Sequence, residues 1–145
     1  MINGKTISLI VPCKNEARII GAFIKRVPKF VDEILIIDNN STDNSVKVAK
    51  KAGARVIKEP RAIGGIGYGF AHMKGLEEAK GDYIVAMDGD DTYPLEAIPE
   101  IVKKMQRQQI NFVSCNRLPL KNKKAISWVR QLGITILNLE VRLFY

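Results

Sequence analysis

The stretch TISLIVPCKNE, residues 6–16, runs from consecutive apolar residues directly into a polar segment. We expect a strand over residues 6–11, because a short run that is apolar at consecutive positions is typical of a strand buried on both faces of a parallel sheet. Comparable runs occur at residues 33–37, 55–57, 83–87 and 111–115. The sequence therefore predicts five strands.

The segments between these runs are long enough for the helices that connect parallel strands. We expect Pro28 to stop a first helix, Ser41 or Thr42 to cap a second, and Gly53 to close that second helix. Two further helices are expected over residues 69–80 and 95–109. The predicted fold class is α/β, with an open, mostly parallel sheet and helices on both faces.

The composition indicates one globular chain with a preference for anionic partners. Of the 145 residues, 46% are hydrophobic, and 23 Lys and Arg against 15 Asp and Glu give a formal net charge of +8. No signal peptide or membrane-spanning run is apparent, so we expect a cytoplasmic protein with at most peripheral membrane contact. Cys13 and Cys115 form no metal or redox motif and are expected to be buried.

Candidate chemistry gathers at the ends of three expected strands, over residues 12–16, 38–43 and 88–94. In open α/β sheets, ligands bind beyond the carboxyl ends of the strands. Asp88 and Asp90 can face the same side of an extended segment, and Gly89 between them would leave room for a ligand. Such oxygen ligands suit Mg²⁺ or Mn²⁺, which keep open positions for phosphate oxygens. The alternative is a solvated Asp-Gly turn.

Five motifs, taken in order, resemble those of family 2 glycosyltransferases, especially the polyprenol-phosphate branch that includes dolichol-phosphate mannose synthase. They are IVPCKNE (10–16), IDNNSTD (37–43), GYGFA (67–71) with Gly75, Gly81-Asp82, and Asp88-Gly89-Asp90. The resemblance implies a GT-A fold and a UDP- or GDP-linked sugar donor. It further implies transfer of a hexose, with inversion, to a polyprenyl phosphate at the inner face of the membrane.

The resemblance also assigns roles to individual residues. It places Pro12, Lys14 and Glu16 around the nucleoside, Ile37, Asp38 and Asn39 near the base, Asp88, Gly89 and Asp90 at the metal and diphosphate, and Arg117 at the phosphates. Asp90, through the metal, and Arg117 are the predicted catalytic residues, because both would stabilise negative charge on the departing diphosphate. Asn39 stands where family members commonly have a second acidic residue, which leaves uracil or guanine open as the base.

The last part of the chain differs in character from the rest. A basic run from Arg117 to Arg130 precedes an amphipathic helix whose apolar residues would pack on the core or on a membrane surface. We expect residues 1–116 to form the nucleotide-sugar-binding core and residues 117–145 to begin the acceptor side. Because the chain ends on apolar residues, we expect it to be part of a longer protein. The basic run would contact phosphates or be a solvated face; without interleaved aromatic residues it does not indicate nucleic-acid binding.

Three other interpretations bear on function. The main alternative is a donor-binding fragment or pseudoenzyme that transfers nothing. A dinucleotide-binding dehydrogenase is disfavoured, because the glycines of residues 64–69 lack the G-x-G-x-x-G spacing and do not follow the first strand. A sugar-phosphate nucleotidyltransferase is disfavoured, because residues 12–16 are not a glycine-rich loop. His72 is expected to be structural, Lys74 a solvated charge, and Asp82 the end of a turn at Gly81. The oligomeric state stays open.

Overall fold

The computed structural model describes residues 1–61, 67–90 and 93–115. The chain divides into two compact units, Met1–Asn111 and Phe112–Tyr145. Only residues 112–115 of the second unit are described, so Arg117 and the predicted terminal helix lie outside the described residues. The fold below is that of the first unit, and the predicted division after residue 116 stays a prediction.

The centre of the first unit is a parallel sheet of four strands in the order β3-β2-β1-β4. The strands are β1 (Ile7–Cys13), β2 (Glu33–Asp38), β3 (Arg55–Lys58) and β4 (Tyr83–Ala86). β1 pairs with β2 from Ser8 opposite Glu33 to Cys13 opposite Asp38, and with β4 on its other side. The connections therefore reverse direction at β1, and this switch point is where open α/β sheets bind ligands.

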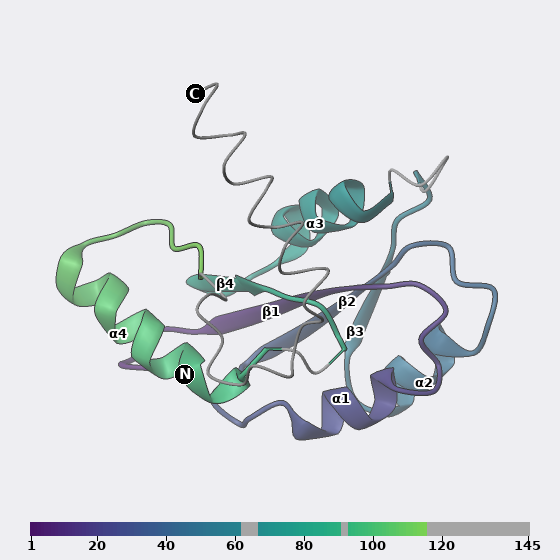
Figure 1. The fold of residues 1–145 in the computed structure, drawn as a ribbon, viewed down its shortest axis with the longest axis horizontal. Helices are drawn as coiled ribbons and strands as arrows, with labels where there is room; N and C mark the ends of the chain where they lie inside the picture. Colours follow the sequence, from purple (N-terminus) through teal and green to yellow (C-terminus); the bar gives the residue numbers. More distant parts are fainter. Residues whose placement is uncertain (62–66, 91–92, 116–145) are drawn as a thin grey trace, which may run out of the picture. The chain divides into compact units, whose positions relative to one another are not determined.

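Helices cover both faces of the sheet, as Figure 1 shows. They are α1 (Ile20–Arg26), α2 (Ser45–Lys51), α3 (Gly67–Glu78) and α4 (Ile98–Gln108), the last preceded by a 3₁₀ turn at Leu95–Ala97. Alternate residues of β1 point to opposite faces. Leu9 and Val11 join the cluster that contains α1, α2 and α4, whereas Ile10 joins Ala71 of α3. The predicted α/β class with helices on both faces is confirmed.

The predicted fifth strand is wrong for the described residues. Residues 111–115 form no strand, and the Phe112 side chain is 80% exposed. An apolar run becomes a strand only where a neighbouring strand pairs with it and its side chains are covered, and neither condition can be read from the run itself. Cys115 is accordingly exposed while Cys13 is buried, so the expectation of two buried cysteines holds for Cys13 alone.

The second helix begins later than expected. α2 starts at Ser45, whose backbone N–H and hydroxyl both donate to Asp43, so Ser41 and Thr42 do not cap it. The predicted end at Gly53 is confirmed, because Gly53 adopts a φ of 100°, which glycine tolerates without steric cost. α1 ends before Pro28 as predicted, and α3 begins two residues before the predicted residue 69.

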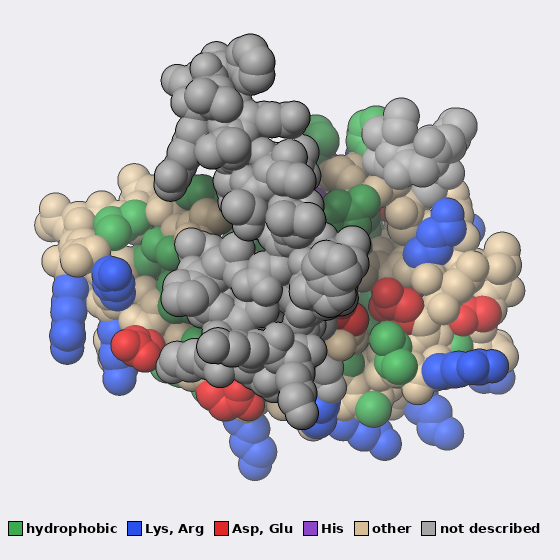
Figure 2. Space-filling model, in the orientation of Figure 1, with side chains coloured by type: hydrophobic (Ala, Val, Ile, Leu, Met, Phe, Trp, Pro, Cys, Tyr) green, Lys and Arg blue, Asp and Glu red, His purple; other side chains and the backbone are tan. Residues whose placement is uncertain are grey.

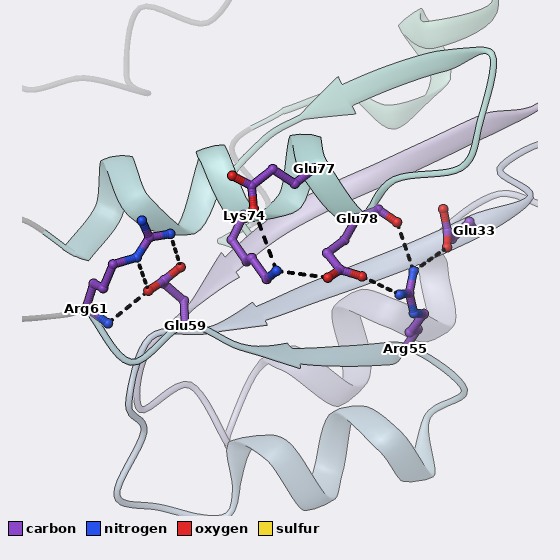
Figure 3. Close-up of polar contacts among 7 residues, drawn as sticks. All are labelled: Glu33, Arg55, Glu59, Arg61, Lys74, Glu77 and Glu78. Atoms are coloured by element: carbon purple, nitrogen blue, oxygen red, sulfur yellow. Dashed lines mark hydrogen bonds and ion pairs between the residues drawn. The ribbon is translucent and has the colours of Figure 1, made fainter.

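Ion pairs fix α3 to the sheet, as Figure 3 shows. Arg55 on β3 contacts Glu33 at 3.2 Å and Glu78 of α3 at 2.6 Å, and Lys74 contacts Glu78 at 2.9 Å. Lys74 is thus an ion-paired residue rather than a solvated charge. Partly exposed pairs of this kind each contribute little to stability. Of these pairs, that of Arg55 with Glu78 joins α3 to the sheet, whereas that of Lys74 with Glu78 lies within α3 and that of Arg55 with Glu33 joins two strands. Among the described helices, none is long and apolar enough to cross a membrane.

Candidate functional site

A cavity of about 210 Å³ lies at the carboxyl ends of β1 and β4. Its walls come from the three polar strand ends predicted to converge and from the start of α3. The lining residues are Pro12, Cys13, Lys14, Glu16, Asn39, Tyr68, Asp88 and Asp90. The structure therefore brings together Pro12, Lys14, Glu16, Asn39, Asp88 and Asp90 of the predicted site.

The other predicted residues do not line this cavity. Ile37 is fully buried in the sheet, and the Asp38 carboxylate, 2% exposed, accepts a hydrogen bond of 3.2 Å from the Ser41 N–H. Gly89 is buried, and a side chain there would meet Val11 at 3.1 Å, Ile20 at 3.4 Å and Glu16 Oε2 at 3.5 Å. The glycine therefore packs against β1 and α1 beside the Glu16 carboxylate, and its predicted contact with a ligand stays a prediction. Arg117 lies outside the described residues.

Side chains of the β2–α2 connection hold the loop that follows β1. The Asn15 N–H donates to Ser41 Oγ at 3.0 Å, and Asn15 Oδ1 accepts from the Thr42 N–H at 2.8 Å. The Glu16 N–H donates to Ser45 Oγ at 2.8 Å, and Asn15 itself has a φ of 56°, a left-handed conformation that asparagine tolerates. The two loops thus form one platform, which fixes Lys14 and Glu16 beside Asn39.

Glu16 is a carboxylate without its full set of partners. Its Oε2 is buried and has no hydrogen-bond partner among the described residues. Burial raises the pKa of Glu16, and the negative charges of Asp90 and Asp88 raise it further, against a hydrogen bond from the Cys13 thiol that lowers it. The same burial, with the charge of Glu16, raises the pKa of Cys13 to about 12, so this thiol stays protonated and unreactive at neutral pH. The carboxylate cluster is therefore suited to receiving positive charge.

Asn39 presents a second buried acceptor. The residue is 9% exposed, and its Oδ1 has no hydrogen-bond partner among the described residues. Its backbone N–H donates to the Cys13 carbonyl at 2.9 Å, which ties it to β1. A Cβ at position 67 would lie 2.7 Å from Asn39 Cγ and closer still to both amide atoms. Gly67 is therefore required for the Asn39 amide to occupy this position.

Two tyrosines hold the Asp88 carboxylate. The Tyr68 hydroxyl donates to Asp88 Oδ1 at 2.6 Å, and the Tyr93 hydroxyl donates to Asp88 Oδ2 at 3.3 Å. Neither tyrosine, nor Cys13, was predicted from the sequence to have a role in the site, although all three lie within the motifs or strand ends singled out there. Tyr68 stands between Gly67 and Gly69, and no signal in the sequence places its hydroxyl at Asp88.

His72 and Asp82 have structural roles, as predicted. His72 packs edge-on against the Tyr68 ring with centroids 4.5 Å apart, and burial lowers its pKa. Asp82, at the opposite end of β4, accepts from the Thr6 N–H and from Lys5 Nζ, each at 2.9 Å. These hydrogen bonds lower the pKa of Asp82 to about 2.

The cavity suits a divalent cation that also binds a ligand. Among the described residues, no three His, Cys, Asp or Glu side chains form a group able to hold a metal ion by themselves. Asp88, Asp90 and Glu16 line one cavity, and one oxygen of Glu16 is buried without a hydrogen-bond partner among the described residues. Two carboxylates with remaining positions filled by phosphate oxygens and water match the usual binding of Mg²⁺ to nucleotides. The residues present therefore fit such an ion.

The comparisons with known proteins agree on one protein family. Residues 8–141 match the model of glycosyl transferase family 2. The protein RfbJ of Shigella flexneri is 32% identical over 117 residues, which cover 78% of this chain and 86% of RfbJ. An undecaprenyl-phosphate 4-deoxy-4-formamido-L-arabinose transferase of Aeromonas hydrophila is 28% identical over 149 residues, which cover 95% of this chain and 44% of that enzyme.

Solved structures share the fold. Glucosyl-3-phosphoglycerate synthase of Mycobacterium tuberculosis aligns with a TM-score of 0.59 and 31% identity over 70% of this chain and 41% of that one. The same enzyme, crystallised with Mn²⁺, uridine-diphosphate-glucose and phosphoglyceric acid, aligns with a TM-score of 0.52 and 33% identity over 60% of this chain and 34% of that one. The described fold is thus of the GT-A type, and the chain spans less than half of this synthase.

Proposed function

Because the chain belongs to glycosyl transferase family 2, we propose that it forms the donor site of a metal-dependent hexosyltransferase that uses a UDP-linked sugar. The observation that carries the proposal is the cavity at the switch point of the sheet, where Asn39, Lys14, Asp88 and Asp90 meet. An amide, a cation and a pair of carboxylates are the groups needed for a base, a diphosphate and a metal ion.

Asn39 is proposed to contact the base and to favour uracil over guanine. Its amide offers one acceptor and one donor. Uracil presents an N–H between two carbonyls, which complements that pair. Guanine also presents an N–H beside a carbonyl, but an amide paired with these groups would leave the second N–H donor of guanine without an acceptor, whereas a carboxylate could accept from both donors. The Asn39 Oδ1 is buried without a partner, so an N–H from the base would donate the hydrogen bond that this oxygen lacks. The related synthase structure with uridine-diphosphate-glucose supports the same base.

Asp88 and Asp90 are proposed to hold Mg²⁺ or Mn²⁺ against the diphosphate. The ion would neutralise the negative charge that develops as the diphosphate leaves the anomeric carbon of the sugar. Lys14 lines the same cavity and would pair with a phosphate, and Arg117 is proposed to do so from the following segment. Glu16 closes the cavity beside the carboxylates, and its buried oxygen would accept a hydrogen bond from the donor or from a water molecule on the ion.

The proposed acceptor is a polyprenyl phosphate. The undecaprenyl-phosphate transferase relative acts on such a lipid, and the structural neighbour was crystallised with phosphoglyceric acid, so both names point to phosphorylated acceptors. An anionic phosphate can attack without a base to remove its proton, so the reaction makes few demands on further side chains. Phosphoglycerate is the second candidate, and transfer assays with each acceptor distinguish the two.

Peripheral contact with an anionic membrane surface is proposed from the distribution of charge. Figure 2 shows Lys and Arg side chains along the margin where Figure 1 places α1, α2 and α4. Exposed basic residues of these helices include Lys25, Arg26, Lys50, Lys51, Lys103 and Lys104. Basic side chains near an anionic leaflet attract it in a salt-dependent way. Binding to vesicles containing anionic lipid, lost at high salt, is the expected result; equal binding to neutral vesicles would contradict it.

The test of the donor site is isothermal titration of UDP and GDP into the chain, with Mn²⁺ and then with chelator. We expect tighter binding of UDP than of GDP, and loss of the metal-dependent part in Asp88→Asn and Asp90→Asn. Glu100→Gln removes an exposed carboxylate of α4 and serves as a charge-matched control. Unchanged metal-dependent binding in both aspartate variants would refute the proposal.

The second candidate function is donor binding without transfer. The chain spans 44% of the lipid-phosphate transferase and 41% of the synthase but 86% of RfbJ, so transfer by these 145 residues has to be measured directly. Hydrolysis or transfer of a UDP-linked hexose by the 145-residue chain would exclude it. Metal-dependent UDP binding with no turnover on either acceptor would favour it.

A further inference from the structure

The Asp88 carboxylate is held at both oxygens by tyrosine hydroxyls from different parts of the chain. Tyr68 belongs to the first turn of α3 and Tyr93 to the segment between β4 and α4. The distances are 2.6 Å to Oδ1 and 3.3 Å to Oδ2. Hydrogen bonds to an ionised carboxylate are shorter and stronger than neutral ones, and the Tyr68 bond is of that short kind. Asp88 is therefore constrained in both rotation and tilt.

This arrangement leaves the carboxylate able to bind a cation. Each carboxylate oxygen has two lone-pair sites, so one phenol on each oxygen leaves one site on each for another ligand. A carboxylate free to rotate would lose side-chain entropy on binding an ion, whereas one already oriented loses less. The two hydroxyls thus reduce the cost of ion binding without occupying the whole carboxylate.

A packing contact with a neighbouring side chain sets the position of the Tyr68 ring. Tyr68 is 54% exposed, yet its ring packs edge-on against His72 one turn along α3. α3 is in turn fixed to the sheet by the ion pair between Arg55 and Glu78, drawn in Figure 3. The hydroxyl therefore reaches Asp88 from a helix whose position is set by the sheet.

We propose that Tyr68 and Tyr93 are positioning residues that hold the Asp88 carboxylate in the orientation in which it binds the divalent cation. The inference rests on the proposed metal site at Asp88 and Asp90. Side chains that hydrogen-bond to a metal ligand orient it, and losing one such partner typically weakens metal binding about 10- to 100-fold. Tyr68 has the shorter bond, so its loss should weaken binding more than that of Tyr93.

The experiment measures Mn²⁺ binding to the chain in the presence of UDP, from the electron paramagnetic resonance signal of free Mn²⁺. The variants are Tyr68→Phe, Tyr93→Phe and Asp88→Asn, with Tyr83→Phe at the start of β4 as the matched control. Phenylalanine keeps the ring that packs on His72 and removes only the hydroxyl. We expect Tyr68→Phe to raise the Mn²⁺ dissociation constant by about 10-fold or more, Tyr93→Phe by less, and Tyr83→Phe not at all. UDP binding in chelator should not change in any tyrosine variant, and thermal unfolding checks that each is folded.

The outcomes separate this inference from the proposed function. Loss of Mn²⁺ binding in Asp88→Asn with wild-type binding in Tyr68→Phe would overturn the positioning role and leave the metal site standing. Tighter Mn²⁺ binding in Tyr68→Phe would also overturn it, because the hydroxyl would then compete with the ion. Weaker UDP binding in chelator would make Tyr68 a direct donor ligand instead. Full Mn²⁺ binding in Asp88→Asn would refute the metal site itself.

Discussion

The substitution Gly67→Ala should remove base recognition while leaving the chain folded. Gly67 is the first residue of α3, and its α-carbon lies against the Asn39 amide. An alanine Cβ would lie 2.7 Å from Asn39 Cγ, against 3.4 Å for the start of ordinary van der Waals contact, a deficit of 3.4 − 2.7 = 0.7 Å. Because both amide atoms would be closer still, Asn39 must move away from its present position.

The size of the effect follows from the two hydrogen bonds that Asn39 would make to uracil. Each is worth about 0.5–1.5 kcal/mol, so losing both costs about 1–3 kcal/mol of binding free energy. At about 1.4 kcal/mol per tenfold change, UDP should bind roughly 5- to 150-fold more weakly. Crowding costs about 1–3 kcal/mol of folding stability, partly offset by the better helix propensity of alanine, about 0.5–1 kcal/mol. The net loss of stability is then about 0–2.5 kcal/mol, so the variant should stay folded while its UDP binding weakens.

The assay is titration of UDP with Mn²⁺, alongside urea unfolding of the same preparations. Gly69→Ala is the matched control, because it lies in the same helix and a Cβ there would meet nothing within 4 Å. It should bind UDP normally and unfold at slightly higher urea. If Gly67→Ala were folded and bound UDP as tightly as Gly69→Ala does, the role given to Asn39 would be wrong.

Three further changes test the scaffold. Ile10→Ala removes a fully buried side chain under α3 and should lower the free energy of unfolding by about 2–5 kcal/mol, measured in urea; a change under 1 kcal/mol would contradict the packing. Hydrogen bonds from Arg61 lower the pKa of Glu59 from 4.5 to about 2, so the stability they give is present above about pH 4.5 and lost as pH falls toward 2. Glu59→Gln should therefore flatten the decline of the unfolding midpoint in that window, and an unaltered slope would exclude this role. Asp43→Ala removes the hydrogen bond from the Ala17 N–H that joins the two loops, together with those from the Ser45 N–H and hydroxyl at the start of α2, and should weaken UDP binding at least about 2- to 12-fold; equal affinity would show that the platform holds without Asp43.

The sheet could be predicted from the sequence because each of its four strands contains its own short apolar run. Residues 7–13 are apolar except for Ser8, and residues 34–37 are apolar throughout, as strands covered on both faces must be. Residues 111–115 carry the same local signal without forming a strand. The difference lies in pairing and cover, which a five-residue run does not encode.

Some residues of the candidate site could be predicted from the sequence, and others could not. Asp88 and Asp90 could be predicted, because two residues at one strand end are placed by the strand itself, and both line the cavity. Gly89 was expected to leave room for a ligand, but its contacts with Val11, Ile20 and Glu16 could not be predicted, because they depend on what lies behind the loop. Tyr68 could not be placed at all, because its contact with Asp88 depends on where α3 packs on the sheet.

The cavity is also where stability and binding make opposite demands on the side chains. In the described part of the chain, the buried side-chain oxygens without hydrogen-bond partners are Glu16 Oε2 and Asn39 Oδ1, and both residues line the cavity. A buried acceptor left without a donor costs about 1–3 kcal/mol, so folding alone would favour apolar residues at both positions. Local rules of folding are expected to fail where a site must be complementary to something other than the protein. Glu16 and Asn39 line the same cavity as Asp88 and Asp90, and so the cost falls where donor and cation are proposed to bind and to supply the missing partners.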